Sequence, residues 1–253
     1  MIGVIAVPFF DTPENQRGET TRATLRDIYY DLDPGHTVVP VDNGSTDLST
    51  WEWLQETFKA FPLAVRLEKP QSVAYAVNVA WRPFENVLLS GDAVAVKCDS
   101  DWAPRATAGP KRNWLARIIE VFEQPDPPGL LGPTLIGELD WRTGDVRDGW
   151  EVTTYVRGTV VARSPECFRA IGYCRHPGDV RWGWQDHWDC FRARRAELEV
   201  GVLTNCRICP RTEQNSLPEE ERTRWRAEGR AAYVQWIAEV IRGERGLYEE
   251  ARL

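Results

Sequence analysis

The sequence has no run of about 20 apolar residues, so it predicts no membrane-spanning helix. It has no excess of basic residues either: the net charge of −7 argues against a protein that coats nucleic acid or anionic membranes by long-range attraction, while leaving room for a local basic groove. The first ten residues lack a basic start and a small-residue cleavage site, and Pro8 closes a run of strand length. We therefore expect a buried first strand in a cytoplasmic protein.

Cysteines are few and scattered. The six lie at positions 98, 167, 174, 190, 206 and 209, mostly in apolar segments. Only Cys206 and Cys209 form a CxxC pair, and a structural zinc site usually needs a second pair of ligands. We expect buried thiols rather than a disulfide framework or a zinc site.

The first half of the chain alternates short β-rich runs with helical stretches. The runs cover residues 3–8, 37–41, 63–67 and 93–98, and the stretches between them, which carry apolar residues three and four apart, cover 20–32, 49–61 and 72–81. This alternation predicts an α/β fold with a mixed, mostly parallel sheet flanked by helices. Ligands of such sheets bind at the carboxyl ends of the strands, where Pro8, Asp42 and Asp99 lie.

The pattern changes after residue 101. A helix is expected over 113–124, a strand over 158–164 and a second helix over 184–197. In the tail, Ser216 with Glu219 three residues later and Pro218 between them predicts a helix start. Its apolar positions make that helix amphipathic, and we expect it to pack on the sheet or on a partner chain; they are Trp225, Ala232, Trp236, Val240 and Ile241.

Acidic residues lie at the ends of two predicted strands and at the start of a predicted helix. They are Asp42 in VPVDNGSTD, Asp99 and Asp101 in VKCDSDW, and Asp186 in GWQDHWDC. Each has an ordinary explanation, because Asp residues favour turns, solvated strand ends and the first turn of a helix. The Asp-x-Asp spacing is also weak by itself, since DLD at 31–33 repeats it. Positions two apart on a strand do face the same side, so Asp99 and Asp101 can converge on one site.

Together with AYAVNVAW (74–81) and GTVVARSPECFRAIGY (158–173), these three segments resemble the family 2 glycosyltransferases of GT-A fold over residues 2–205. The resemblance implies a GT-A, Rossmann-like fold and inverting transfer of a sugar from a nucleoside-diphosphate sugar, with UDP favoured, to an acceptor hydroxyl. The acceptor is expected to be a glycan, a small molecule or a hydroxylated nucleic-acid base. Residues 1–101 are then a nucleotide-sugar-binding half, 102–215 an acceptor-binding and catalytic half, and 216–253 a C-terminal helical extension.

The resemblance also implies roles for particular residues. Asp186 matches the catalytic base, and Asp99 and Asp101 match the pair that binds Mn²⁺ or Mg²⁺. Donor contacts are implied for Pro8, Asp42, Lys69, Asn78, Asp99 and Ser100, and acceptor contacts for Trp182, Trp184 and Gln185. A cation held by carboxylates and phosphates neutralises charge on the departing diphosphate, while a carboxylate base deprotonates the attacking hydroxyl.

Some positions depart from the family pattern. Phe9 and Phe10 follow Pro8 where a hydroxyl residue is common, so the base pocket is expected to differ in shape. Ser72 and Val73 stand where a glycine is usual. None of the histidines, at 36, 176 and 187, lies downstream of the Asp186 segment, so no third metal ligand is identified.

Three other functions compete with the glycosyltransferase. A phosphatase of the haloacid dehalogenase type would use Asp99 as nucleophile, but no lysine follows Lys111 as that chemistry requires. A nucleotidyltransferase would use a basic first loop, for which Arg17, Gly18 and Arg22 offer a thin match. A non-catalytic, tryptophan-rich carbohydrate-binding module would explain the tryptophans but not acids at three element ends.

Overall fold

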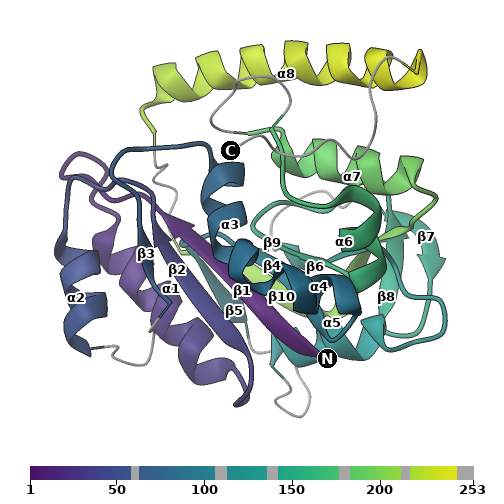
Figure 1. The fold of residues 1–253 in the computed structure, drawn as a ribbon, viewed down its shortest axis with the longest axis horizontal. Helices are drawn as coiled ribbons and strands as arrows, with labels where there is room; N and C mark the ends of the chain where they lie inside the picture. Colours follow the sequence, from purple (N-terminus) through teal and green to yellow (C-terminus); the bar gives the residue numbers. More distant parts are fainter. Residues whose placement is uncertain (58–62, 106–112, 136–141, 177–182, 212–216, 244–253) are drawn as a thin grey trace.

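The computed structural model describes residues 1–57, 63–105, 113–135, 142–176, 183–211 and 217–243 (Figure 1). Its described strands form one ten-stranded sheet in the order β3-β2-β1-β4-β9-β6-β10-β8-β7, with β5 paired to β10. The strands are β1 Ile2–Phe9, β2 Thr37–Asp42, β3 Val65–Arg66, β4 Ala93–Cys98, β5 Trp102–Arg105, β6 Leu130–Leu135, β7 Arg142–Val146, β8 Trp150–Thr153, β9 Val160–Arg163 and β10 Val200–Pro210.

The sheet is mixed, and its first part is parallel. Strands β3, β2, β1 and β4 run parallel, β9 runs antiparallel to both β4 and β6, and β10 is parallel to β6 but antiparallel to β8 and β5. The sheet includes strands from both sides of residue 101, where the sequence analysis expected a boundary. The predicted α/β class is confirmed, although the strand expected over 63–67 is reduced to Val65–Arg66.

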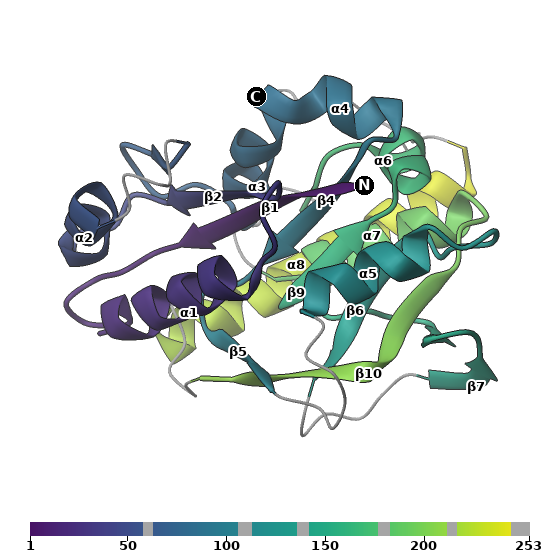
Figure 2. The ribbon, with the colours of Figure 1, turned by 90° about the horizontal axis from the view of Figure 1, so that it is seen from below.

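Helices cover both faces of this sheet (Figure 2). They are α1 Gly18–Asp31, α2 Ser49–Thr57, α3 Val73–Trp81, α4 Glu85–Ser90, α5 Trp114–Phe122, α6 Pro165–Ile171, α7 Gln185–Arg195 and α8 Glu219–Ile241, with a 3₁₀ turn at Arg82–Phe84. Strand β1 shows why both faces close, since alternate side chains point to opposite sides. Ile5 and Val7 pack in the cluster with α1 and α5, whereas Val4 and Ala6 pack with α3 and α4.

Helix α8 does not lie on the sheet, which was one of the two surfaces expected for it. It crosses above α7 (Figure 1), where Tyr233 contacts Trp184 at a ring-centroid distance of 5.3 Å and Trp236 contacts Trp188 at 5.0 Å. Ile241 is 66% exposed and does not belong to the packed face. The Ser216 cap lies outside the described residues, and Pro218 occupies the N-cap.

All six cysteines are free, as expected, and four of them are buried. Within the described ranges, no helix combines the length and the apolar character that crossing a membrane requires.

Candidate functional site

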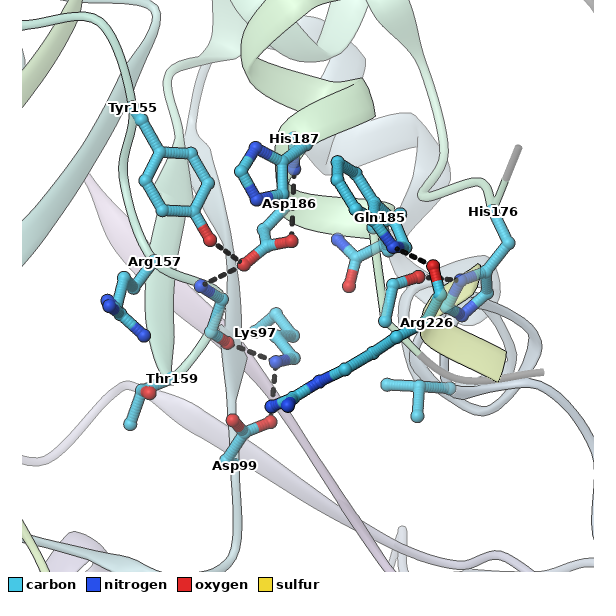
Figure 3. A pocket seen from close by; sticks show the side chains of 14 residues that line it. Lys97, Asp99, Tyr155, Arg157, Thr159, His176, Gln185, Asp186, His187 and Arg226 are labelled. Atoms are coloured by element: carbon cyan, nitrogen blue, oxygen red, sulfur yellow. Dashed lines mark hydrogen bonds and ion pairs between the residues drawn. The ribbon is translucent and has the colours of Figure 1, made fainter. Parts of the chain in front are cut away.

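A pocket of about 470 Å³ opens where β4, the segment between β8 and β9, the start of α7 and helix α8 meet (Figure 3). This volume lies within the range of small-ligand sites. Its polar lining includes Lys97, Asp99, Tyr155, Arg157, Thr159, His176, Gln185, Asp186, His187 and Arg226. Two sequence-predicted acids, Asp99 and Asp186, are therefore brought together from positions 87 residues apart.

Asp186 lies in the first turn of α7 with its carboxylate fixed on both oxygens. Oδ2 accepts hydrogen bonds from the Tyr155 hydroxyl and, at 3.1 Å, from the Gly158 amide, while Oδ1 accepts from the His187 amide at 3.0 Å. The His187 ring stacks on Tyr155 at 4.1 Å. Burial first, and the charge of Asp186 second, raise the pKa of Tyr155, so the phenol stays protonated as a donor.

Lys97 connects the two acids. Its side chain is 5% exposed on the central strand β4, and its ammonium donates to Asp99 Oδ1 at 2.5 Å and to the Gly158 carbonyl. Burial alone would lower the pKa of Lys97, but the charges of Asp99 and Asp186 together raise it, which keeps the ammonium charged. Sequence reasoning missed this residue, although a lysine inside the apolar run AVAVKC was a visible signal.

Gly158 is the point of closest approach between these side chains. A Cβ at this position would lie 3.2 Å from both Lys97 Nζ and Asp186 Cβ, which is tighter than ordinary van der Waals contact. The Gly158 peptide thereby bridges Asp186, through its N–H, to Lys97, through its carbonyl. Only glycine fits this bridge without moving one of the two charged groups.

Asp99 and Asp101 are the residues that could hold a divalent cation. The pKa of Asp99 is raised to about 6, chiefly by burial at the pocket floor and further by the charge of Asp101, although Lys97 opposes the rise; 37% of the side chain is still accessible. Asp101 forms an ion pair with Arg17 at 2.9 Å. Across the described residues, no group of three or more His, Cys, Asp or Glu side chains forms a metal cage.

The donor set fits a particular kind of cation site. Mg²⁺ and similar hard cations are commonly held by one or two carboxylates together with substrate phosphates, rather than by the protein alone. Asp99 and Asp101 meet that description, because they lie close enough for the charge of Asp101 to raise the pKa of Asp99. A cation binding here would have to share or displace the ammonium of Lys97 and the guanidinium of Arg17.

Asp42 lies outside this pocket, fully buried at the end of β2. Its Oδ1 accepts from the Ser45 amide at 2.9 Å. Its Oδ2 is 3.2 Å from Arg66 Nε but in a geometry that makes no hydrogen bond, so this buried oxygen has no hydrogen-bond donor in the part of the chain that the structure describes. Pro8 lies beside it, paired with Val41 in the β1–β2 register.

Asp11 is an acid that the sequence analysis overlooked. It is fully buried just after β1 and accepts from the hydroxyls of Thr21, at 2.9 Å, and Thr50, at 2.7 Å. These contacts join α1 and α2 to the strand end beside Asp42. Burial raises the pKa of Asp11, and the charge of Asp42 contributes to the rise.

Several predicted contact residues have other partners. Asn78 donates to the Cys174 carbonyl and accepts from the Cys174 amide, both at 2.9 Å, so its buried amide holds that segment; the donor contact expected for it stays a prediction. Lys69 is exposed in the segment between β3 and α3, and Ser100 is buried between the two acids without lining the pocket.

Two of the three predicted acceptor residues line the pocket. Trp184 lines the pocket; its ring contacts His187 and Tyr233, and its Nε1 donates to the main chain of α8, while the acceptor contact expected for it stays a prediction. Gln185 also lines the pocket, with its amide donating to Asp189 at 2.6 Å. Trp182 lies outside the described residues.

A buried charged network lies beneath α7. Asp189 accepts from Arg163 at 2.5 Å, from Gln185 at 2.6 Å and from Arg192 at 3.4 Å, and the two arginines also donate to the carbonyls of Gly172 and Ile171. These side chains are at most 4% exposed. Because the network ties α7 to β9 and to the end of α6, it fixes the helix that carries Asp186.

His176 holds the other side of the α7 start. Its Nε2 accepts from the Ala74 amide at 3.3 Å, which leaves Nδ1 as the protonated nitrogen that donates to the Gly183 carbonyl at 2.8 Å. Burial lowers the pKa of this imidazole to about 4, so it is neutral at pH 7. Sequence reasoning noted its position but assigned it no role.

No protein-family model and no curated protein matches the sequence. Solved structures do match the fold. They include GalNAc-T7 with UDP, GalNAc and Mn²⁺ (TM-score 0.61, 13% identity, 83% of this chain), a mannosyltransferase from Pyrobaculum calidifontis with GDP-Man and Mn²⁺ (0.59, 22%, 95%), and S. aureus TarS with UDP-GlcNAc (0.55, 14%, 85%).

Because all three sequence identities are low, the similarity shows a shared fold alone, which is the GT-A fold of glycosyltransferases. The matched region is 44%, 64% and 60% of those three chains, respectively, so this protein spans about half to two thirds of their length. Each of these three neighbours was solved with a nucleotide or a nucleotide sugar, and two of them with Mn²⁺.

Proposed function

We propose that this protein is an inverting glycosyltransferase of the family 2 type, moving a sugar from a nucleoside-diphosphate sugar to an acceptor hydroxyl with Asp186 as general base. One observation carries the proposal: Asp186 is linked through the Gly158 peptide and Lys97 to Asp99 within a single pocket. Two carboxylates with different neighbours suit two roles, one toward the acceptor and one toward the donor.

Asp186 is suited to take the proton from the acceptor hydroxyl. As the acceptor oxygen attacks the anomeric carbon, its proton passes to the Asp186 carboxylate, and the bond to the diphosphate breaks with its electron pair on the diphosphate oxygen. Attack from the face opposite the leaving group inverts the anomeric centre. A base of this kind contributes about 10² to 10⁴-fold. The hydrogen bonds from Tyr155 and Gly158 keep the carboxylate in place.

The nucleotide-sugar donor would bind at the strand ends within the first 101 residues. Asp42 Oδ2 is a buried acceptor that matches the imide N–H of uracil, and a guanine N–H would satisfy the same atom. Asp99 and Asp101 would hold Mn²⁺ or Mg²⁺, which, when bound, neutralises charge growing on the diphosphate. Lys69 and Ser100 stay within the proposed donor side, and the acceptor, whether glycan, small molecule or hydroxylated base, enters beside Asp186.

The competing functions lack a comparable observation. A phosphatase would use Asp99 as nucleophile, but one oxygen of this carboxylate accepts a hydrogen bond from Lys97. A carbohydrate-binding module would need open tryptophan faces, but Trp184 is covered by α8, and Trp150 and Trp188 are buried.

The test is a thermal-shift panel of UDP, GDP, ADP and CDP with and without Mn²⁺, followed by product analysis with sugar donors. Stabilisation by a nucleoside diphosphate that strengthens with Mn²⁺ supports the proposal, and indifference to every diphosphate would refute it. Asp186→Asn should keep nucleotide binding while lowering transfer by about 10² to 10⁴-fold. Asp126→Asn, an exposed acid outside the pocket, is the matched control and should transfer normally.

A further inference from the structure

Helix α8 contributes one side chain to the pocket, Arg226. We infer that Arg226 binds the diphosphate of the donor, so that the C-terminal helix is a working part of the active site. The inference rests on the proposed function, since it names the group that this arginine meets.

The backbone of α8 is fixed against the start of α7. Trp184 Nε1 donates to the Arg226 carbonyl at 2.9 Å, and Gly229 lies so close that a Cβ there would be 2.5 Å from Trp184 Cδ1. Trp184 itself has φ +62°, a left-handed conformation that bulky residues rarely adopt. The strained turn and the close helix contact together fix where Arg226 enters the pocket, independently of its side chain.

Among the neighbouring arginines of α8, Arg226 is the one directed into the site. Figure 3 shows its side chain extending from α8 across the pocket toward Asp99. Arg224 lies 3.8 Å from Glu221 and is 59% exposed, and Arg230 is exposed and does not line the pocket. The helix therefore presents a single guanidinium to the side of the pocket that holds Asp99.

The charge of the pocket favours an anionic ligand. Among the residues that the structure describes, three cations line it, Lys97, Arg157 and Arg226, against two acids, Asp99 and Asp186. A diphosphate brings several negative charges, and a guanidinium binds phosphate oxygens with two parallel N–H donors, more specifically than an ammonium does. Because the Arg226 side chain extends toward Asp99, it is placed for the donor diphosphate rather than for the acceptor beside Asp186.

The experiment compares ligands that differ only in the diphosphate. Calorimetry in Mn²⁺ measures UDP against uridine, and GDP against guanosine, for the wild type, Arg226→Met, Arg226→Lys and the control Arg230→Met. Loss of a hydrogen bond to a charged group should weaken binding of the preferred diphosphate roughly 10- to 100-fold in Arg226→Met and less in Arg226→Lys. Nucleoside affinity and the Arg230→Met protein should be unchanged.

The outcomes separate the two proposals. If the wild type binds a diphosphate and Arg226→Met binds it equally well, the inference is wrong while the proposed function stands. If Arg226→Met loses nucleoside and diphosphate binding alike, with a lower melting temperature, Arg226 is structural and the inference is again wrong. If the wild type binds no nucleoside diphosphate, the proposed function fails and the inference falls with it.

Discussion

Acidification should loosen the start of α7 through protonation of His176. The folded-state pKa of this imidazole is about 4, below the ordinary 6.5, because burial disfavours the charged ring. A histidine with a lowered folded-state pKa binds fewer protons in the folded protein than in the unfolded chain. Its contribution to stability is therefore complete above pH 6.5 and is lost as the pH falls toward 4.

The size of the effect follows from the two pKa values. At pH 5 the loss amounts to about 2 kcal/mol, and at pH 4 to about 3 kcal/mol. In a protein of this length, about 2 kcal/mol corresponds to a fall of roughly 4 to 8 °C in the melting temperature, since each kcal/mol shifts it by about 2 to 4 °C. The ring is 7% exposed, so solvent screening is slight.

Urea unfolding at pH 7.5 and pH 5.0 measures this loss, with His176→Asn as the comparison. The variant is expected to be less stable at pH 7.5, because it loses at least one of the bonds to Ala74 and Gly183. Its disadvantage should shrink by about 2 kcal/mol at pH 5.0. Asp99 titrates in the same window with the opposite sign, and the comparison cancels its contribution. Equal pH dependence of the two proteins, within about 0.5 kcal/mol, would refute the reasoning.

Two further substitutions test the bridge between the acids. Lys97→Met should raise the pKa of Asp99 above about 6, since Lys97 is the main group that lowers it. It should also lower the free energy of unfolding by about 1 to 3 kcal/mol, because the Gly158 carbonyl loses its donor. A carboxyl NMR titration measures the first effect and urea unfolding the second, and an unchanged Asp99 titration would contradict the pairing. Gly158→Ala should push Lys97 and Asp186 apart by a few tenths of an ångström, which should lower kcat up to about 100-fold while nucleotide affinity is kept. Steady-state kinetics measures kcat and calorimetry measures nucleotide affinity. A normal kcat would show that the bridge tolerates a Cβ.

The sequence predicted the parts of the fold that repeat a local period. Strand β1 is a continuous apolar run of strand length, helix α3 has apolar residues at helical spacing, and both lie where expected. The position of α8 could not be predicted in this way. An amphipathic pattern shows that a helix face is covered, but not which surface covers it, and here that surface is α7 rather than the sheet.

The site residues also differ in whether a local sequence pattern could predict them. Asp99 directly follows strand β4 and Asp186 lies in the first turn of helix α7, so both positions could be foreseen from the ends of regular elements. Tyr155 and His176 come from irregular segments without a pattern, and they meet Asp186 and Gly183 only through the tertiary fold. The surroundings of Trp184 could not be predicted either, because no sequence signal indicates a left-handed tryptophan packed against a distant helix.

The order of elements along the chain separates two events during synthesis on the ribosome. Every strand of the described sheet ends by Pro210, so the segments that carry Asp99 and Asp186 leave the ribosome before Arg226 does. Arg226 emerges later, and only then can α8 cover Trp184. A growing chain should therefore acquire its fold before its finished pocket, with an interval in which the indole of Trp184 and the ring of His187 lack their contacts with Tyr233.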